Sequence, residues 1–589
     1  MVCVLKATTH MATLFFQVHN YTASANTLAA QASCTTQKMA DPSHTYLYLG
    51  VALVSLLILL LSKRRRSPEA LRLPPGPWQL PVIGSLHHLA GQLPHRAMRD
   101  LARRYGPVMM LRLGEVPTVV VSSRDAAREV MKTHDTAFAT RPLSSTMRVF
   151  SNGGRDIAFA PYGDYWRQVR RIAVTELLSA RRVLSFRPIR EEEVAAMLRA
   201  AGLAVDLQSA VSALVSDTTT RAVMGDRWKD RDVFLRELDC SLRLAAGFNL
   251  PDLWPSSRLA GRLSGVVREA EKCRDKVFGI LDGIIDQRLQ KAESGAGVDG
   301  EDLIDVLLRI RREGGLQFPL YMDAIKAIIF DIFIAGSDTS ATTLGWAIAE
   351  LIRNPKALQK ATAEVRHAFA SDGVVSEAAL GELHYLNLGN RETFRLHPPA
   401  PLVVPRECRE PCQQVLGYDV PQGTQVLVNA WALGRDKRYW PDHSREEFWP
   451  ERFNDGEAAA GVDFRGVNFE LLPFGAGRRM CPGMAFGLAN VQLPLASLLF
   501  HFDWEVLGLA DPADLDMTEA FGITVRRKSD LLLRPILHML LPSLDSSGPP
   551  ILHTAAILAP LPLATAHRAD TSSDDPYEID VLPMCVASD

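Results

Sequence analysis

A single cysteine, Cys481, lies in a short glycine- and arginine-rich segment, Pro473–Gly483, which reads PFGAGRRMCPG. Glycines let the backbone turn sharply, and backbone N–H groups with nearby positive charge favour a thiolate over a thiol. A thiolate is a strong donor to iron. An apolar helical run, Met484–Leu499, follows, and the positive end of a helix stabilises an anionic sulfur further. The segment therefore predicts a metal-binding thiolate, with a buried cysteine in a glycine-rich loop as the alternative.

A second set of polar residues interrupts an apolar helical stretch. Ala335–Ser340 reads AGSDTS, so Asp338 and Thr339 place a carboxyl and a hydroxyl group among apolar neighbours. Buried polar groups are costly unless they have a partner or a task. A threonine can also bond back to a carbonyl of its own helix and open the helix locally. Both residues are candidate functional residues, and a kinked core helix is the alternative.

Two further pairs have helical spacing. Glu392 and Arg395 are three residues apart and share one helix face, although a solvated surface pair shows the same spacing. Trp166 and Arg170 are four apart, so one face would present an indole N–H and a guanidinium group together. Arginine binds carboxylates well. The alternative for this pair is an interfacial tryptophan beside a solvated arginine.

The segment around Cys481 resembles the signature of the cytochrome P450 family. That signature is a phenylalanine, two residues, a glycine, one residue, an arginine, one residue, the cysteine, one residue and a glycine. Its fixed positions are Phe474, Gly477, Arg479, Cys481 and Gly483. The resemblance implies that the protein binds haem b, with Cys481 as the axial ligand of the iron, and uses O2 as cosubstrate.

Other motifs of the same family follow in the expected order. Glu392–Arg395 resembles the family's ExxR element, whose partner would be Arg452 in the sequence FWPERF; the resemblance implies a structural role for these three residues. Ala335–Ser340 is similar to the oxygen-activating motif, which implies that Thr339 assists oxygen activation and Asp338 proton delivery.

The resemblance also implies a set of residues that bind the haem propionates. These are Trp166, Arg170, Arg479, Arg141 and Arg406. Arg141 and Arg406 are the weaker matches, and a surface salt bridge is the alternative for both.

The elements that position these residues are mainly helical, so the expected fold class is mainly α with small β-sheets, the cytochrome P450 fold. Helical apolar spacing runs through Val266–Leu289 and Tyr321–Ile352. Strand-like runs occur at Val108–Leu113, Thr118–Ser122 and Thr424–Asn429.

A transmembrane anchor is expected at residues 45–62, TYLYLGVALVSLLILLLS. At ~1.5 Å per residue it spans roughly 27 Å, close to a bilayer core. The basic run Lys63–Arg66 follows it and places the remainder in the cytosol; a cleaved signal peptide is the alternative. Residues 63–85 form a basic and proline-rich hinge, with Leu73–Pro77 reading LPPGP.

Residues 86–541 form the expected haem-thiolate monooxygenase domain. Residues 1–44 are expected to be a disordered or mis-annotated extension. Met39 begins a more ordinary membrane-anchored chain, so residues 1–38 would precede the true start, and an organellar transit segment is the alternative for them. Residues 542–589 are rich in proline, alanine, serine and aspartate, and disorder is expected there.

Composition excludes other classes of protein. The chain has 589 residues, of which 47% are hydrophobic and 22% charged, and its net charge of -2 argues against a nucleic-acid binder. Its eight cysteines are sparse and without paired CxxC spacing, so neither a zinc site nor a disulfide framework is expected.

In detail the chain looks like the plant A-type branch of the family. That likeness implies a single-pass protein of the endoplasmic reticulum membrane, with a cytosolic catalytic domain that oxidises a lipophilic plant metabolite such as a terpenoid, phenolic or indole. Electrons would come from NADPH through a separate NADPH–cytochrome P450 reductase. The expected substrate walls are Ser144–Phe150, Phe248–Leu253, Phe330–Ala335, Ala400–Val404 and Phe521–Thr524.

Two alternatives to this function stay open. One is a haem-thiolate isomerase or dehydratase that needs no reductase; related branches of that kind usually lack the helix threonine, so Thr339 argues against it. The other is a catalytically impaired haem-binding membrane protein. It is motivated by Gly389 and Asn390, which stand where the family usually has bulky apolar residues. A glycine costs roughly 1 kcal/mol inside a helix.

Overall fold

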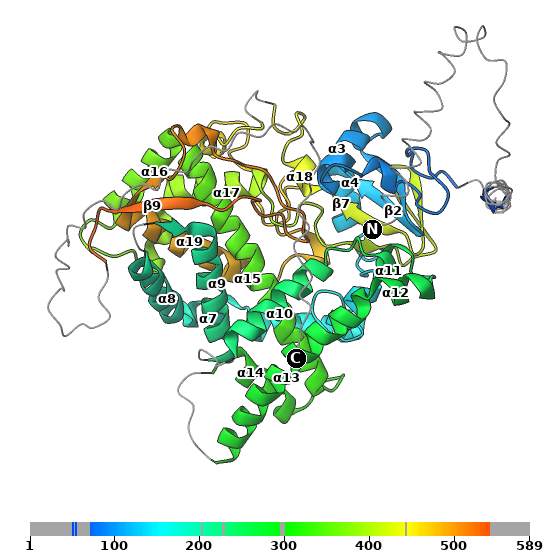
Figure 1. The fold of residues 1–589 in the computed structure, drawn as a ribbon, viewed down its shortest axis with the longest axis horizontal. Coiled ribbons are helices and arrows are strands. Elements are labelled where there is room, and N and C mark those ends of the chain that lie inside the picture. Colours follow the sequence, from blue (N-terminus) through cyan, green and yellow to red (C-terminus); the bar gives the residue numbers. More distant parts are fainter. Residues whose placement is uncertain are drawn as a thin grey trace, which may run out of the picture. The chain divides into compact units, whose positions relative to one another are not determined.

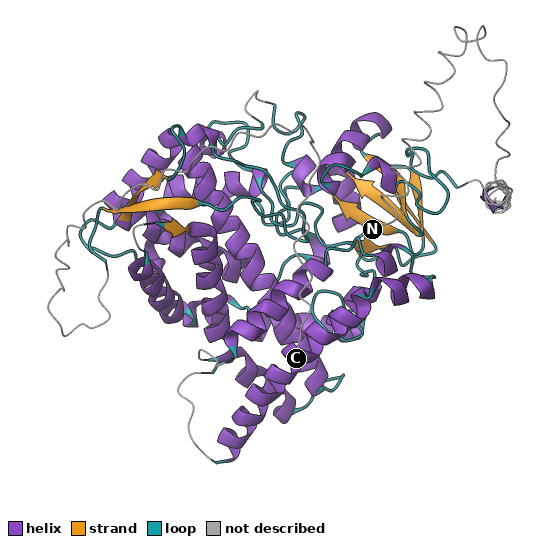
Figure 2. Ribbon diagram, in the orientation of Figure 1, coloured by secondary structure: helices purple, strands orange, loops and turns teal. Residues whose placement is uncertain are grey.

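Helices form most of the described chain, and the small β-sheets lie in separate parts of it, with β2 (Val116–Val121) and β7 (Gln425–Val428) far from β9 (Leu532–Leu537) (Figure 1; Figure 2). The computed structural model describes residues 71–201, 204–225, 230–294, 301–441 and 445–541, together with residues 50, 51, 54 and 55. The predicted class, mainly α with small sheets, is confirmed for these residues.

The α-helices are α3 (Pro94–Tyr105), α4 (Arg124–Arg128), α5 (Ser145–Phe150), α6 (Asp164–Ile172), α7 (Ala180–Ser185), α8 (Arg187–Ala200), α9 (Leu207–Met224), α10 (Arg231–Leu244), α11 (Leu250–Leu253), α12 (Arg258–Ser264), α13 (Val266–Glu293), α14 (Leu303–Glu313), α15 (Met322–Arg353), α16 (Pro355–Ala368), α17 (His384–Leu396), α18 (Ala430–Leu433) and α19 (Met484–His501). The shorter helical turns are η1 (Leu86–His88), η2 (Glu129–Thr133), η3 (Ala173–Leu177), η4 (Glu377–Glu382), η5 (Pro450–Phe453), η6 (Gly477–Arg479) and η7 (Pro512–Asp514).

The strands are β1 (Val108–Leu113), β2 (Val116–Val121), β3 (Val205–Asp206), β4 (Arg406–Glu407), β5 (Cys412–Val415), β6 (Tyr418–Pro421), β7 (Gln425–Val428), β8 (Phe502–Val506) and β9 (Leu532–Leu537). One sheet has the order β1-β2-β7-β4, in which β2 and β7 are parallel and the outer pairs are antiparallel. A second has the order β3-β9-β8, and β5 pairs with β6. All three predicted strands are confirmed, within two residues at each end.

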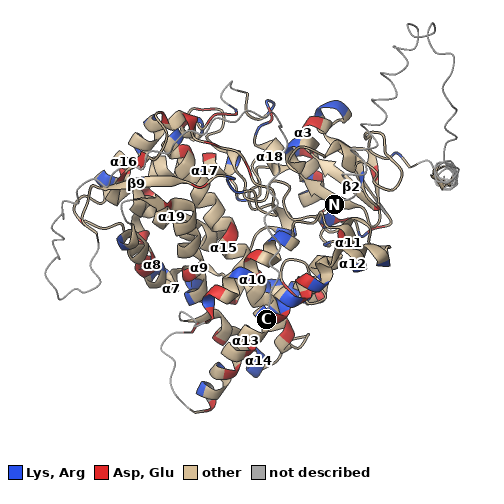
Figure 3. Cartoon of the chain, viewed as in Figure 1, with Lys and Arg blue, Asp and Glu red and all other residues tan. Residues whose placement is uncertain are grey.

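Helix α15 runs through the core because most of its residues are apolar. It is buried on every side over most of its length and packs against α9, α17 and α19. Helix α13, at the surface, carries charged residues of both signs along its length, whereas the core helix α19 carries no Lys, Arg, Asp or Glu (Figure 3). The predicted helices at Val266–Leu289 and Tyr321–Ile352 are therefore confirmed as α13 and α15.

The predicted membrane anchor, residues 45–62, lies outside the described residues except for Gly50, Val51, Val54 and Ser55, which are helical and exposed. Within the part of the chain that the structure describes, one helix, α19, is long and apolar enough to cross a membrane. Since 67% of it is buried inside the protein, α19 is a core helix. The predicted extensions, residues 1–44 and 542–589, also lie outside the described residues.

Candidate functional site

The loop that carries Cys481 is held in a tight turn between η6 and α19. The backbone N–H of Cys481 donates to the carbonyl of Phe474 at 3.0 Å, which closes the loop. Gly477 has a φ of 69°, and a Cβ on it would lie 2.0 Å from the carbonyl oxygen of Met131. Only glycine fits this position, because any side chain would meet fixed backbone. Helix α19 begins at Met484, where the sequence predicted it.

Cys481 faces a space inside the protein. The side chain of Cys481 has accessible surface, yet burial raises the pKa of its thiol. This combination indicates that the accessible surface lines an internal space and does not face bulk solvent. Ala485 on α19 is also exposed, and so is Ala335 in the middle of the otherwise buried α15. The two helices meet beside these residues, since a Cβ on Gly487 would lie 3.6 Å from the hydroxyl of Ser340. A large flat ligand between the helices would cover the exposed surfaces.

Burial raises the pKa of the Cys481 thiol, and the N–H of Gly483 and the charge of Arg170 oppose that rise only in part. The N–H group and the positive charge thus favour the thiolate, as the sequence predicted, but burial outweighs them in the protein by itself. A bound metal cation supplies what is missing, because a coordinating thiol loses its proton.

Four arginines predicted to bind the propionates lie together beside this space. Arg141, Arg406 and Arg479 are buried, and Arg170 is partly buried. Their guanidinium groups donate mostly to main-chain carbonyls: Arg141 to Val404 at 2.6 Å and Pro405 at 2.7 Å, Arg170 to Met480 at 2.5 Å, Arg406 to Ala476 at 2.8 Å, and Arg479 to Ala139 at 2.7 Å and Ala160 at 2.5 Å. The surface salt bridge considered for Arg141 and Arg406 is excluded, because both side chains are buried.

This cluster holds more positive than negative charge. Burial lowers the pKa of all four guanidinium groups, that of Arg479 to about 9, and repulsion between arginines adds to the effect at Arg141 and Arg479. Asp135 pairs with Arg406 at 2.8 Å and is the one ion-pair partner that the described residues give the four. Buried charges are costly unless they are paired. Two carboxylates would relieve the excess, so the residues present fit the propionates of a haem.

Trp166 lies against the same cluster. Its indole N–H donates to the carbonyl of Ile157 at 3.1 Å, and its ring lies 4.2 Å from the guanidinium carbon of Arg479. Trp166 and Arg170, predicted to act on one ligand together, therefore have separate partners in this structure. Trp166 is also buried, which excludes an interfacial position.

Asp331 on α15 and Asp156 were missed by the sequence reasoning. The carboxylate of Asp331 accepts from the backbone N–H groups of Ile157 and Ala158 at 2.8 and 2.9 Å. The carbonyls of the same two residues accept from Trp166, Arg141 and Arg479. Burial raises the pKa of Asp331 to about 6, and burial and Asp331 raise that of Asp156. An acid within an apolar helix was the available signal, the same one that marked Asp338.

Glu392, Arg395 and Arg452 come together in the core, with 0–2% of their side chains exposed. Arg395 binds Glu392 through two hydrogen bonds of 2.7 and 2.8 Å, and Arg452 reaches the same carboxylate at 3.0 and 3.1 Å. Arg395 also donates to the carbonyls of Gly434 and Arg445. A solvated surface pair is therefore excluded. Phe474 packs on Phe394 of the same helix, with ring centroids 5.1 Å apart, which links this cluster to the Cys481 loop.

Asp338 and Thr339 lie where α15 borders the internal space. The hydroxyl of Thr339 donates to the carbonyl of Ala335 at 2.5 Å, as expected, but α15 continues unbroken from Met322 to Arg353, so the predicted opening of the helix is not seen. The carboxylate of Asp338 accepts from the hydroxyl of Thr524. Burial raises the pKa of Asp338.

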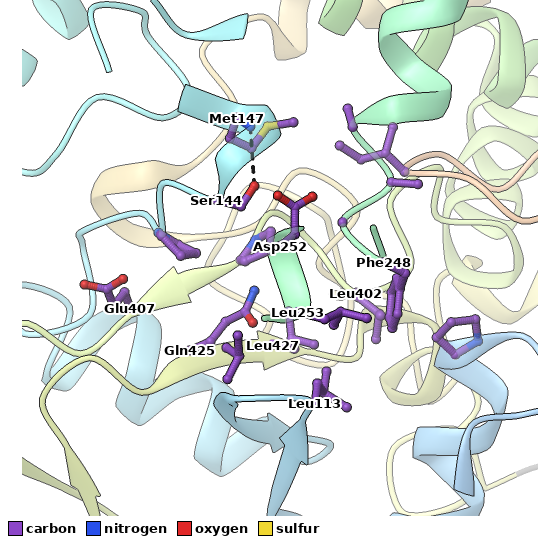
Figure 4. Close-up of a pocket in the computed structure, with 18 of the residues that line it drawn as sticks. Leu113, Ser144, Met147, Phe248, Asp252, Leu253, Leu402, Glu407, Gln425 and Leu427 are labelled. Atoms are coloured by element: carbon purple, nitrogen blue, oxygen red, sulfur yellow. Dashed lines mark hydrogen bonds between the residues drawn. The ribbon is translucent and has the colours of Figure 1, made fainter. Parts of the chain in front are cut away.

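A cavity of about 370 Å³ lies between the β1–β7 sheet, α5, α11 and the segment around Phe521 (Figure 4). Four of the five predicted wall segments line it; Phe330–Ala335 does not. Phe248, Leu253 and Leu402 form an apolar side of the cavity in Figure 4, and Glu407 lies at its edge. The carboxylate of Asp252 is occupied by Thr146, whose hydroxyl donates to it at 2.8 Å. The cavity fits a mainly apolar molecule.

Gly389 and Asn390 leave defects in α17. A Cβ on Gly389 would meet nothing within 4 Å, and a small void there is lined by apolar residues such as Leu351 and Leu495. Asn390 is 3% exposed, and neither its amide nitrogen nor its oxygen has a hydrogen-bond partner among the described residues. An unsatisfied buried polar group costs about 1–3 kcal/mol.

Comparisons with known proteins bear on this site. The family model described as Cytochrome P450 matches residues 74–534. The chain is 47% identical to desmethyl-deoxy-podophyllotoxin synthase of Sinopodophyllum hexandrum, over 83% of this chain and 96% of that protein. It is 48% identical to premnaspirodiene oxygenase of Hyoscyamus muticus and 47% identical to 5-epiaristolochene 1,3-dihydroxylase of Nicotiana tabacum, each over 82% of this chain and 96% of the relative.

Proposed function

The chain belongs to the cytochrome P450 family and is an oxidoreductase of the monooxygenase class, and from this premise we propose that it hydroxylates a lipophilic terpenoid of plant secondary metabolism. One atom of O2 enters the substrate and the other leaves as water, with two electrons from NADPH and two protons. The observation that carries the proposal is the internal space between α15 and α19, bordered by Cys481, Ala335 and Thr339, with the arginine cluster at its side.

Haem is the group that this space would hold. When bound, a haem with a thiolate ligand supplies reductive activation of O2 and transfer of one oxygen atom to carbon. Cys481 would hold the iron, Arg141, Arg170, Arg406 and Arg479 would hold the propionates, and the hydrogen-bonded loop around Gly477 would keep the sulfur in place. The Glu392–Arg395–Arg452 cluster would brace the loop through Phe394 and Phe474.

The side chains of α15 would handle protons. Asp338 is partly buried and its carboxylate accepts from Thr524, and the hydroxyl of the next residue, Thr339, borders the internal space. A buried acid beside a hydroxyl group can pass a proton over one hydrogen bond at a time. In this proposal Asp338 takes up protons and Thr339 orients the last donor before the reacting oxygen.

The substrate class is inferred from the cavity and from the relatives. The cavity of about 370 Å³ is mainly apolar, and two relatives are named for oxygenation of premnaspirodiene and dihydroxylation of 5-epiaristolochene. A terpenoid is therefore the first class to test, with phenolics and indoles next. We also propose that residues 45–62 anchor the protein in the endoplasmic reticulum membrane, and that NADPH–cytochrome P450 reductase supplies electrons on its cytosolic side.

The test is expression of the full chain in membranes with a plant reductase, haem and a panel of terpenoids, phenolics and indoles. A thiolate-type spectrum of the reduced, CO-bound protein and a reductase-dependent hydroxylated terpenoid are the expected results. A product formed without reductase or NADPH would instead indicate an isomerase or dehydratase. A protein without the thiolate-type spectrum when haem is supplied would contradict the proposal.

Thr339→Ala should uncouple the reaction, so that NADPH is consumed while product per NADPH falls by roughly tenfold or more, the lower end of what a positioned proton donor contributes. Thr343→Ala is the matched control, because Thr343 makes the same kind of bond one turn later, from its hydroxyl to the carbonyl of Thr339 at 2.8 Å. Equal coupling in the two variants would remove the role assigned to Thr339.

A further inference from the structure

Thr524 lies in a hairpin that reaches from the surface to α15. Residues 519 and 527 are bridged, and the N–H of Ala520 donates to the carbonyl of Arg526 at 2.8 Å. Gly522 permits the tight turn at its end, since a Cβ there would lie 2.5 Å from the carbonyl oxygen of Thr524. The hairpin therefore presents Thr524 at a fixed place.

The same hairpin is attached to α15 at two points. The hydroxyl of Thr524 donates to the carboxylate of Asp338, and the indole N–H of Trp346, two turns further along α15, donates to the carbonyl of Val525 at 2.9 Å. The N–H of Val525 also donates to the carbonyl of Pro399 at 2.9 Å. Trp346 is 1% exposed, so this attachment lies in the core.

The hairpin also forms a wall of the cavity. Phe521, Gly522, Ile523 and Val525 line it, and the ring of Phe521 meets that of Phe248 at 5.7 Å. The residues on either side of Thr524 therefore face the space for the substrate, while the side chain of Thr524 turns to α15. A molecule that displaces this wall would also displace the partner of Asp338.

We propose that Thr524 is a positioning residue for proton delivery: its hydroxyl holds the carboxylate of Asp338 beside Thr339 and couples the fit of the substrate to the proton path. The inference rests on the proposed monooxygenase function. Thr524 was expected from the sequence only as part of a substrate wall, and no local pattern around it indicates a partner 186 residues away.

Charge at the site gives the direction of the effect. Burial raises the pKa of Asp338, while the Thr524 hydrogen bond and the charge of Arg526 lower it and the charge of Asp239 on α10 raises it. Among the described residues, Arg526 and Asp239 are the charged groups that act on the Asp338 carboxylate. Loss of the Thr524 hydroxyl removes one stabilising bond from the carboxylate, so Asp338 should stay protonated to a higher pH and lose its fixed orientation.

The experiment compares Thr524→Val with Thr524→Ser in the haem-loaded full chain with reductase. Thr524→Val should lower product per NADPH by roughly tenfold, the size expected for one hydrogen bond to a charged group, and move the acidic limb of the pH–rate profile to higher pH. Thr524→Ser keeps a hydroxyl and should behave like the natural protein. Thr518→Val is the matched control, because the hydroxyl of Thr518 binds the Asp516 carboxylate at 2.9 Å on the exposed part of the same hairpin.

A second readout is independent of turnover. The infrared carboxyl band that disappears in Asp338→Asn reports the protonation of Asp338, and in Thr524→Val it should titrate at higher pH. An unchanged titration and an unchanged pH profile in Thr524→Val would overturn the proposal. Thr524→Ala takes its place in both measurements should Thr524→Val lack the thiolate-type spectrum. A natural protein that forms the spectrum but no product with any substrate would instead contradict the monooxygenase function, and the infrared titration would still decide the role of Thr524.

Discussion

At the scale of single residues, the charge on the sulfur of Cys481 depends on whether a metal is bound to it. In the protein alone burial holds its pKa above the ordinary range, and the nearby N–H of Gly483 and charge of Arg170 do not compensate. The loop thus fixes the position of the sulfur, and the metal determines its charge. The arginine cluster shows the complementary behaviour, because it holds buried positive charge that a dianionic ligand would balance.

Cys481→Ala should abolish the thiolate-type spectrum of the reduced, CO-bound protein, because the iron loses its sulfur ligand. Cys240→Ala is the matched control, since Cys240 is a half-buried free thiol on α10, outside the Cys481 loop. The difference spectrum of each variant in membranes supplies the measurement. A normal thiolate-type band in Cys481→Ala would sink the assignment of the ligand.

At the scale of elements, α17 combines a well-satisfied ion cluster with two defects. Glu392 and Arg395 are fully paired, whereas one turn earlier Gly389 leaves a void and Asn390 an unpaired amide. The departure from the family pattern noted in the sequence therefore has a visible structural consequence, one that lowers stability without breaking the helix.

Gly389→Ala should raise the free energy of unfolding by about 1 kcal/mol through helix propensity, and further by filling part of the apolar void. Gly279→Ala is the control, because Gly279 is exposed on α13 and a Cβ there also meets nothing within 4 Å. Denaturant unfolding of both variants separates the two contributions. A decrease in stability for Gly389→Ala would show that the void is needed.

Helices α10 and α13 bring two thiols together that the sequence did not pair. Sγ of Cys240 and Sγ of Cys273 are 2.8 Å apart, and burial raises the pKa of Cys273, so the Cys273 thiol stays protonated in the resting protein. A disulfide needs a separation of about 2.0 Å, which a small side-chain movement supplies.

Glutathione disulfide at alkaline pH should therefore join Cys240 to Cys273: the two thiols lose two protons and two electrons, and one glutathione disulfide is reduced to two glutathione thiols. Peptide mapping by mass spectrometry under non-reducing conditions measures the link, and Cys240→Ser should prevent it. Unchanged alkylation of both thiols after such treatment would contradict the expectation.

At the scale of the whole molecule, the acid pair Asp156–Asp331 joins the segment that carries the arginine partners to α15. Burial and mutual repulsion raise the pKa of Asp156, and burial raises that of Asp331 to about 6. The folded protein therefore holds protons that the unfolded chain releases. The stability of the protein therefore falls as the pH rises from the pKa of an unfolded aspartate to the raised pKa values of the folded pair, and it stays lower above them.

Asp156→Asn should flatten this dependence, because an amide keeps the hydrogen bond from the N–H of Phe159 at 3.0 Å and cannot carry a negative charge beside Asp331. The thermal midpoint of the natural protein should fall as the pH rises from about 4 through the folded pKa of Asp331 at about 6, and that of Asp156→Asn should fall less. Asp232→Asn, at a side chain 87% exposed, is the surface control. Parallel curves for all three proteins would contradict the role of the pair.

The local features of the protein could be predicted from its sequence alone. The spacing of Phe474, Gly477, Arg479, Cys481 and Gly483 identified the thiolate loop, apolar periodicity identified α13 and α15, and the departure at Gly389 and Asn390 was visible before any contact was known. These signals are readable because residue type and short spacing fix backbone turns, helix faces and local packing.

Contacts between residues far apart in the chain became known from the tertiary structure. The tertiary structure pairs Asp338 with Thr524, and it lets Asp331 accept from the backbone of the segment whose carbonyls bind the arginines. Trp166 and Arg170 have different partners in it, and Phe330–Ala335 lies outside the cavity wall. It also showed that burial, rather than local charge, governs the thiol of Cys481. The physical reason is that desolvation and long-range hydrogen bonds depend on what packs around a group, which no local pattern of residues records.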